Sequence, residues 1–299
     1  MRTGGLALIV AVLATPAPLV AQNPAPDATS VLAAMREALG GEKRLTAVKT
    51  FVATGRTRQV RGDNLVPIEF EIACELPDKY VRKDEIPAQE SGPTSVGFSG
   101  DNLIQVPPQA APPVQGRPGG APAPTPEQLD AARRARVIGV KQDFARLVLG
   151  MFAASFSGYP LTFSYVGQAE APQGMADVLE AKGAVNLTMR FFVYRDTHLP
   201  VMVTWQGAAP GAGRGSGRAP GGPPGSGPGP GPPPAAGAGP AAGMPPENRI
   251  YFADYREIDG VKWPFRLRRA IGADTIEETA FDRFRINAKI DPKKFEVSR

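Results

Sequence analysis

The chain has 299 residues, of which 42% are hydrophobic, and a formal net charge of +5 at pH 7. This length is sufficient for one large domain with a substantial core. So small a charge on so long a chain argues against nucleic-acid binding, and a single cysteine excludes an intramolecular disulfide framework.

The N-terminus has the pattern of a secretory signal peptide. Arg2 precedes an apolar run at residues 6–14, which is followed by prolines and by Ala21, a small residue at an expected cleavage point. The run is too short to span a bilayer. We therefore expect residues 1–21 to be removed, residues 22–28 to form a disordered lead-in, and the mature protein to be periplasmic or secreted.

The next segment predicts a short helix followed by five strands. The helix is expected at Val31–Leu39, with Ala28-Thr29-Ser30 as its cap and Gly40-Gly41 as its end. Turn signals rich in Gly, Asp, Asn and Pro separate the expected strands, which are Val48–Val60, Leu65–Leu76, Lys79–Ile86, Thr94–Ser99 and Leu103–Val106.

The second of these strands has the clearest alternation in the sequence. Ile68, Phe70, Ile72 and Cys74 fall on one face, and glutamates fall on the other. Cys74 is therefore predicted to be a small buried apolar residue.

A long helix is predicted in the middle of the chain, from Pro126 to Ala153, after a Pro/Gly/Ala-rich loop at residues 107–124 that we expect to be disordered. Thr125 and Gln128 have the spacing of a capping box. A helical wheel places Arg133 within one broad apolar stripe and Arg146 opposite it. The stripe, which needs a partner surface, consists of Leu129, Val137, Val140, Phe144, Leu147, Val148 and Met151.

Strand patterns then resume on both sides of a second tract, residues 207–246, which is almost entirely Gly, Pro and Ala and is expected to be disordered. The strands are expected at Leu161–Ala169, Ala176–Lys182, Val185–Arg195, Leu199–Trp205, Arg249–Glu257, Val261–Ile271 and Thr275–Ile286. The last three form an antiparallel meander with hairpin turns at Asp259-Gly260 and Gly272-Ala273-Asp274. We interpret the tract as an enlarged hairpin loop, because an interdomain linker would leave a three-stranded piece too small to be stable alone.

These elements predict one mostly β domain of the α+β class over residues 29–299. It would be a single curled antiparallel sheet of roughly 11–12 strands, an incomplete β-barrel, with the mid-chain helix as a lid and a short N-terminal helix. The apolar face under the lid would form a trough, for which ordinary core packing is the alternative interpretation. The candidate lining residues are Phe70, Ile72, Val140, Phe144, Leu147, Met151, Phe191, Trp205, Phe252, Trp263 and Phe265.

The sequence contains no recognisable catalytic set. His198 is the only histidine and lies in a predicted turn, and no nucleophile elbow, phosphate-binding loop or Cys/His cluster is present. We therefore predict a non-enzymatic protein without metal or cofactor. A group of basic residues on neighbouring strands is either a solvated face or a rim for anionic headgroups or an acidic partner, and consists of Arg266, Arg268, Arg269, Arg283 and Arg285.

Several short motifs in this order of elements point to a known family. They are Gly40-Gly41 with Val48-Lys49-Thr50-Phe51, Pro77-Asp78-Lys79-Tyr80-Val81-Arg82, Leu199-Pro200-Val201, Tyr251-Phe252-Ala253-Asp254-Tyr255 and Asp259-Gly260-Val261-Lys262-Trp263-Pro264. The chain resembles the outer-membrane lipoprotein-sorting (LolA-like, LolA–LolB–LppX) superfamily of periplasmic lipid carriers from Val31 to Phe295, apart from the two Pro/Gly tracts. The resemblance implies an incomplete barrel closed by helices, whose cavity takes acyl chains of lipoproteins or lipids.

One position departs from the family pattern. In the carriers, the residue directly after the aromatic of the Pro-x-x-aromatic turn is an Arg implicated in latching the lid, whereas here Val81 follows Tyr80 and the arginine is Arg82. Strand alternation then predicts that Arg82 lies on the opposite face from the expected one. Arg133, within the stripe of the lid, is the substitute latch candidate, and a solvated arginine is its alternative interpretation.

The sequence thus predicts an exported, monomeric periplasmic carrier that holds an acyl chain or lipoprotein lipid under a helical lid, for lipid or lipoprotein trafficking in the envelope and with peripheral membrane contact. The alternative is an envelope interaction or stress-sensor regulatory protein that uses the same fold to bind a protein partner. Deleting residues 207–246 would distinguish them, because the carrier hypothesis expects lipid binding to survive.

Overall fold

The computed structural model describes residues 27–87, 89–90, 92–108, 124–207 and 245–297. The expected signal peptide, nearly all of the lead-in and most of the two Pro/Gly loops lie outside these residues.

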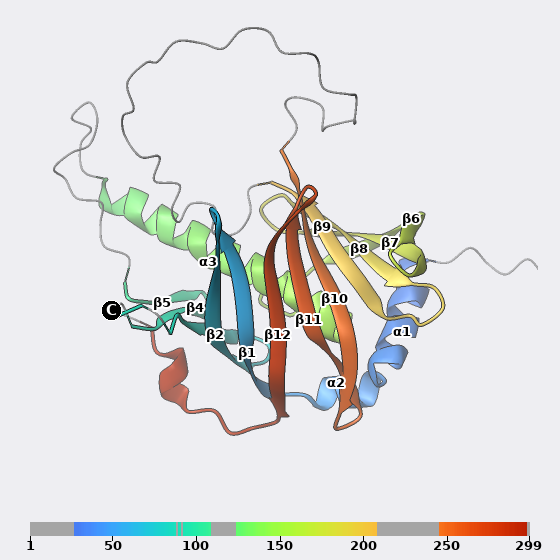
Figure 1. Cartoon of the computed structure of the whole chain (residues 1–299), viewed down its shortest axis with the longest axis horizontal. Coiled ribbons are helices and arrows are strands. Elements are labelled where there is room, and N and C mark those ends of the chain that lie inside the picture. The colour runs from blue at the N-terminus through green and yellow to red at the C-terminus, as the bar shows by residue number, and fades with distance from the viewer. Residues whose placement is uncertain (1–26, 88, 91, 109–123, 208–244, 298–299) are drawn as a thin grey trace, which may run out of the picture.

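One continuous antiparallel sheet dominates the described part of the chain (Figure 1). It has twelve strands in the order β5-β4-β3-β2-β1-β12-β11-β10-β9-β8-β7-β6, and the edge strands β5 and β6 are not paired with each other, so the sheet is not closed into a barrel. This confirms the predicted fold class. The strands are β1 Thr50–Arg61, β2 Asn64–Glu75, β3 Lys79–Glu85, β4 Thr94–Ser99, β5 Asn102–Val106, β6 Thr162–Ala171, β7 Gly174–Gly183, β8 Leu187–Tyr194, β9 Pro200–Gln206, β10 Glu247–Ile258, β11 Val261–Ile271 and β12 Asp274–Ile286.

The C-terminal meander lies in the centre of the sheet, where β12 pairs with β1 and β10 pairs with β9. Because β9 and β10 are antiparallel neighbours, residues 207–246 join the two strands of a hairpin, as predicted. The β10–β11 turn has positive φ at both Asp259 (51°) and Gly260 (75°). Positive φ at both positions is the geometry of a primed hairpin turn, which explains the Asp-Gly signal.

The helices are α1 Ala28–Leu39, α2 Glu42–Ala47 and α3 Pro126–Phe152, with a final 3-10 turn, η1, at Pro292–Phe295. The capping box of α3 at Thr125 and Gln128 is confirmed. The cap expected for α1 was misplaced, because Asp27 is its N-cap and accepts from the backbone N–H of Ser30. The helix α2 was not predicted, since its six residues are too few to establish a helical period.

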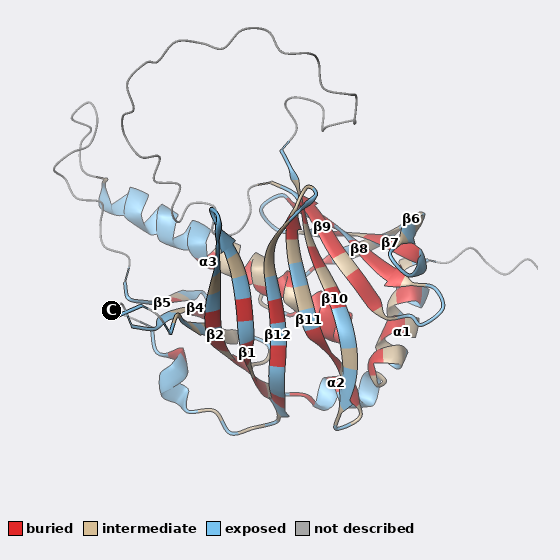
Figure 2. Ribbon diagram, viewed as in Figure 1, coloured by how far each residue is buried: buried red, intermediate tan, exposed pale blue. Residues whose placement is uncertain are grey.

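The core lies between α3 and one face of the sheet, which we call the inner face. Figures 1 and 2 view the opposite, outer face, and α3 passes behind the central strands. On β2 the alternation places Phe70, Ile72 and Cys74 in the core, which confirms the predicted burial of Cys74. On the outer face, Phe295 of η1 covers a smaller apolar cluster that includes Ala73 and Val81.

Candidate functional site

The helix α3 lies across the inner face and contacts β4, β5, β9 and β11. The helix approaches the sheet closely at Gly150, where any Cβ would collide with the ring of Phe252 on β10. Beside it, the Tyr255 hydroxyl donates a hydrogen bond of 2.9 Å to the Gly150 carbonyl oxygen. Glycine at this position therefore lets the helix backbone contact the Phe252 ring directly.

The eleven predicted lining residues all belong to the single cluster between α3 and the sheet. Nine are buried, and Val140 and Leu147 are half-buried and pack against the others. Their rings pack on neighbouring aromatics: the centroids of Phe144 and Tyr80 are 4.6 Å apart, and those of Trp263 and Phe152 are 5.3 Å apart. The structure thus brings the predicted set together, and its role in holding a ligand stays a prediction.

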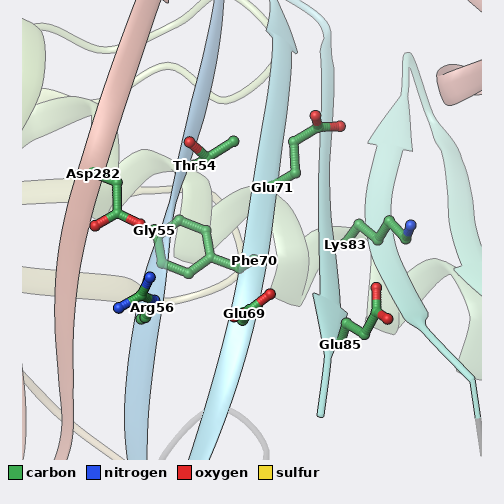
Figure 3. Close-up of a pocket in the computed structure, with 9 residues that line it drawn as sticks. All are labelled: Thr54, Gly55, Arg56, Glu69, Phe70, Glu71, Lys83, Glu85 and Asp282. Carbon is green, nitrogen blue, oxygen red and sulfur yellow. The ribbon is translucent and has the colours of Figure 1, made fainter. Parts of the chain in front are cut away.

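Two clefts open on the outer face. One, of about 310 Å³, lies over β1, β2, β3 and β12 and mixes carboxylates with Arg56 and Lys83 (Figure 3). Its lining residues are Thr54, Gly55, Arg56, Glu69, Phe70, Glu71, Lys83, Glu85 and Asp282. The other, of about 490 Å³, is floored by Phe192, Met202 and Tyr251 beside the paired Glu247 and Arg249.

Arg82 lies on the inner face, so the expectation that it points away from the lid side was wrong. It pairs in register with Ile72, its guanidinium lies 4.6 Å from the Phe70 ring centroid, and Val81 instead faces the outer cluster. Tyr80, two residues before Arg82, stacks on Phe144 of α3. The face that carries the aromatic residue therefore also carries the arginine, because they are two positions apart on a strand.

Arg82 begins a polar row that crosses the inner face. It donates hydrogen bonds to Asp84 (2.7 Å) and to the Thr57 hydroxyl (3.0 Å), which lies 2.9 Å from the Thr279 hydroxyl. The row continues on β12 and β11 with Glu277 and Arg269, whose charged atoms are 3.7 Å apart. Thr57 and Thr279 are buried, so their mutual hydrogen bond satisfies groups that water does not reach.

Arg146 is the buried arginine of α3, contrary to the wheel, which placed it opposite the stripe. Its side chain is 6% exposed, Nη1 lies 2.6 Å from Asp143 Oδ1, and the guanidinium lies 4.1 Å from the Trp205 ring centroid. Burial lowers the pKa of Arg146, and burial also raises the pKa of Asp143 although Arg269 and Arg146 oppose that rise. The i,i+3 spacing of Asp143 and Arg146 is the sequence feature that could have indicated this ion pair.

Arg133 and Leu129 are residues of α3 that do not lie between the helix and the sheet. Every residue from 126 to 136 is exposed, because this part of α3 extends past the sheet (Figure 1). Leu129 is 45% exposed. Only the stripe residues from Val137 onward therefore pack on the sheet, because the sheet is not wide enough to reach the earlier ones.

Within the described stretches, no three His, Cys, Asp or Glu side chains are grouped so as to hold a metal ion. Nor does this part of the chain include a helix long and apolar enough to cross a bilayer.

No family model and no curated protein matches the sequence. The structure is similar to that of a LolA superfamily protein from Nitrosomonas europaea, with 13% identity, a TM-score of 0.50, and coverage of 91% of this chain and 98% of that chain. An outer membrane lipoprotein-sorting protein domain from Vibrio parahaemolyticus matches at 9% identity and a TM-score of 0.45, covering 90% of this chain and 97% of that one. A DUF1329 family protein from Desulfovibrio piger matches at 7% identity and a TM-score of 0.42, with the same two coverages. The chain has a LolA-like fold.

Proposed function

We propose that this protein is a non-enzymatic periplasmic carrier that holds an acyl chain between α3 and the inner face of the sheet. The LolA-like fold supports this proposal, as does the composition of the inner face, which is largely aromatic and aliphatic. Residues 29–299 would form the single domain that carries this site.

The observation that carries the proposal is the way α3 covers the open sheet. Apolar contacts dominate the interface, and hydrogen bonds such as that from Tyr255 to Gly150 and ion pairs such as that from Lys141 to Asp101 (2.6 Å) hold it in place. Because the side chains pack against one another, a ligand would enter by displacing the helix. Each buried CH₂ of an acyl chain would contribute about 0.8 kcal/mol toward the cost of that displacement.

Trp263 offers a polar contact within the apolar site. Its indole Nε1 is buried and has no hydrogen-bond partner among the described residues. A buried donor without a partner costs about 1–3 kcal/mol. The ester or carboxyl oxygen of an acyl ligand would satisfy it, and Arg82, on the same inner face, is the remaining candidate for a latch.

The test is whether the purified full chain carries or takes up lipid. Native mass spectrometry with solvent extraction should find a bound amphiphile, and a fluorescent fatty acid should gain intensity on mixing. Leu147→Lys, at a half-buried lining position, should lower uptake at least about tenfold, since a charge in an apolar site is strongly disfavoured.

The matched control is Val166→Lys, at a position that is 51% exposed on β6, and it should leave uptake unchanged. Circular dichroism checks that both variants fold. A ligand-free spectrum together with no uptake by the unmodified chain would exclude the carrier function. Equal loss of uptake in both variants would place the ligand elsewhere.

Export is proposed on the N-terminal pattern alone. When the full chain is expressed in a Gram-negative bacterium, the periplasmic product should begin at Gln22 in its intact mass. A cytoplasmic product that retains Met1 would contradict export.

A further inference from the structure

Six arginines form an exposed strip on the outer face of three neighbouring central strands. They are Arg56 and Arg58 on β1, Arg283 and Arg285 on β12, and Arg266 and Arg268 on β11. We call this set the arginine strip. The register places Ala280 of β12 between Arg56 and Arg266, and Glu278 between Arg58 and Arg268. Arg269, which the sequence grouped with this set, lies instead on the inner face with Glu277.

Most of these guanidinium groups have no partner within the part of the chain that the structure describes. Arg56, Arg58, Arg283 and Arg285 make no ion pair or hydrogen bond with the described residues. Arg268 stacks on Tyr251 at 4.2 Å, and Arg266 Nε is 4.0 Å from Asp254 Oδ2, a carboxylate already held by Arg256 at 2.6 Å. The strip therefore keeps most of its hydrogen-bond donors available.

An exposed apolar pair lies directly beyond the strip. Val60 and Leu65 face each other at the tip of the β1–β2 hairpin and are 43% and 66% exposed. Val60 is two residues beyond Arg58 on β1, so strand alternation places it on the same face. Arginines and large aliphatic side chains thus follow one another along the outer face.

We propose that the arginine strip and the Val60–Leu65 tip dock this protein on an anionic lipid bilayer, with guanidinium groups on lipid phosphates and the hairpin tip in the headgroup region. Arginine matches phosphate oxygens through paired N–H donors, and a basic surface flanked by aliphatic side chains is suited to the membrane interface. The proposal does not depend on the acyl-chain site.

The spacing of the strip favours a surface over a small anion. Strand geometry places Arg56 and Arg58 about 7 Å apart along β1, and Arg56 and Arg266 about 10 Å apart across Ala280. The groups therefore spread over the face and do not converge on one point. The acidic cleft of Figure 3 overlaps the strip at Arg56 and adds Glu69 and Glu71 of β2 and Glu85 of β3 beside it. These carboxylates repel lipid phosphates, so the contact is limited to β1, β12 and β11.

The test is flotation of the full chain with two kinds of vesicle, one of equal parts phosphatidylglycerol and phosphatidylcholine and one of phosphatidylcholine alone. We expect binding to the mixed vesicles at low salt, weak binding to phosphatidylcholine, and loss of binding as salt is raised. Each arginine near an anionic surface contributes about fivefold to the partition coefficient, so Arg56→Gln with Arg266→Gln should lower it about 25-fold.

Two matched controls separate the strip from net charge and general hydrophobicity. Arg134→Gln with Arg136→Gln removes the same charge from the exposed part of α3 and should change binding less than about twofold. Leu65→Ser should weaken binding several-fold, whereas Val185→Ser, at a position that is 64% exposed in the β7–β8 turn, should not. All variants retain the same N-terminal apolar run, so any contribution from it cancels, and circular dichroism checks their folding.

Several results would overturn the proposal. One is a failure of the unmodified chain to bind the mixed vesicles at all. Another is equal weakening of vesicle binding in the Arg56/Arg266 and Arg134/Arg136 double variants, and either result would contradict docking through the strip. Competition by inorganic phosphate beyond that of chloride at the same ionic strength would identify a small-anion site instead. Binding to polyglutamate but not to vesicles would identify an acidic protein surface.

Discussion

The Tyr255 hydroxyl on β10 donates its hydrogen bond to the carbonyl oxygen of Gly150, in the last turn of α3. Carbonyls in the last turn of a helix lack intrahelical partners. The tyrosine therefore both satisfies the helix end and ties α3 to the centre of the sheet.

Tyr255→Phe should lower the free energy of unfolding by about 1–2 kcal/mol, because it leaves a buried carbonyl without its donor. Urea unfolding measures the change. Tyr80→Phe is the matched control: its ring also packs against α3, but its hydroxyl makes no hydrogen bond within the described residues, so its effect should stay within about 0.5 kcal/mol. Equal effects would mean that the Tyr255 hydrogen bond does not hold the helix.

Gly150→Ala should destabilise the protein by about 1–3 kcal/mol, since the added methyl group must displace the Phe252 ring. Gly139→Ala in the same helix has open space around its Cβ and should be stabilising by up to about 1 kcal/mol through helix propensity. The two substitutions have the same chemistry, so opposite signs in urea unfolding would isolate the contact. Stabilisation by both would show that α3 does not rest on Phe252.

Stability should fall in alkaline solution because of Cys74. Burial raises the pKa of its thiol well above the ordinary value. The unfolded thiol ionises near pH 8.5 while the folded thiol keeps its proton, so the unfolded state binds fewer protons and stability declines as pH rises above about 8.5. The Cys74 thiol alone should lower the free energy of unfolding by about 1.4 kcal/mol by pH 9.5.

This pH dependence is measured by urea unfolding from pH 7.5 to 9.5, a window below the ionisation of free tyrosine. Cys74→Ala should remove the Cys74 part of the slope while lowering stability at every pH. The native thiol should also react with a disulfide reagent only after unfolding. An unchanged slope in the variant would assign the alkaline loss to other groups.

The two latch candidates should respond differently to the same substitution. Arg82→Gln removes the charged partner of Asp84 and one of the two hydrogen-bond partners of the buried Thr57 hydroxyl, so it should cost about 1–3 kcal/mol of unfolding free energy. Arg133→Gln, on the exposed part of α3, should change stability by less than about 0.5 kcal/mol. The rate of fatty-acid release should rise only in the Arg82 variant, and faster release from the Arg133 variant alone would restore Arg133 as the latch.

Local patterns predicted most of the fold. The Thr125–Gln128 capping box, the Asp259-Gly260 turn and the alternation around Ile72 each depend on residues close in sequence, and the structure has all three. The helix α2 was missed because it is shorter than two helical turns, so its residues carry no period.

The errors came from relationships that only the assembled sheet defines. Leu129 fits the apolar stripe but is exposed, because α3 extends past the edge of the sheet. Arg146 is buried because its guanidinium stacks on the Trp205 ring and pairs with Asp143. The arginine strip could not be recognised in full, since the pairing of β1 with β12 brings Arg58 beside Glu278, 220 positions along the chain.

The central position of β10–β12 has a consequence for the order of assembly. A chain that emerges from its N-terminus, at the ribosome or at a membrane, can form β1–β5 as one sheet and β6–β9 as another, but the strands that join them are made last. Until they arrive, β1 and β9 present open edges, the kind of backbone surface that recruits other strands and leads to aggregation. Truncation before β10 would therefore divide the molecule through its middle, and a holding chaperone should matter most during the synthesis or translocation of β10–β12.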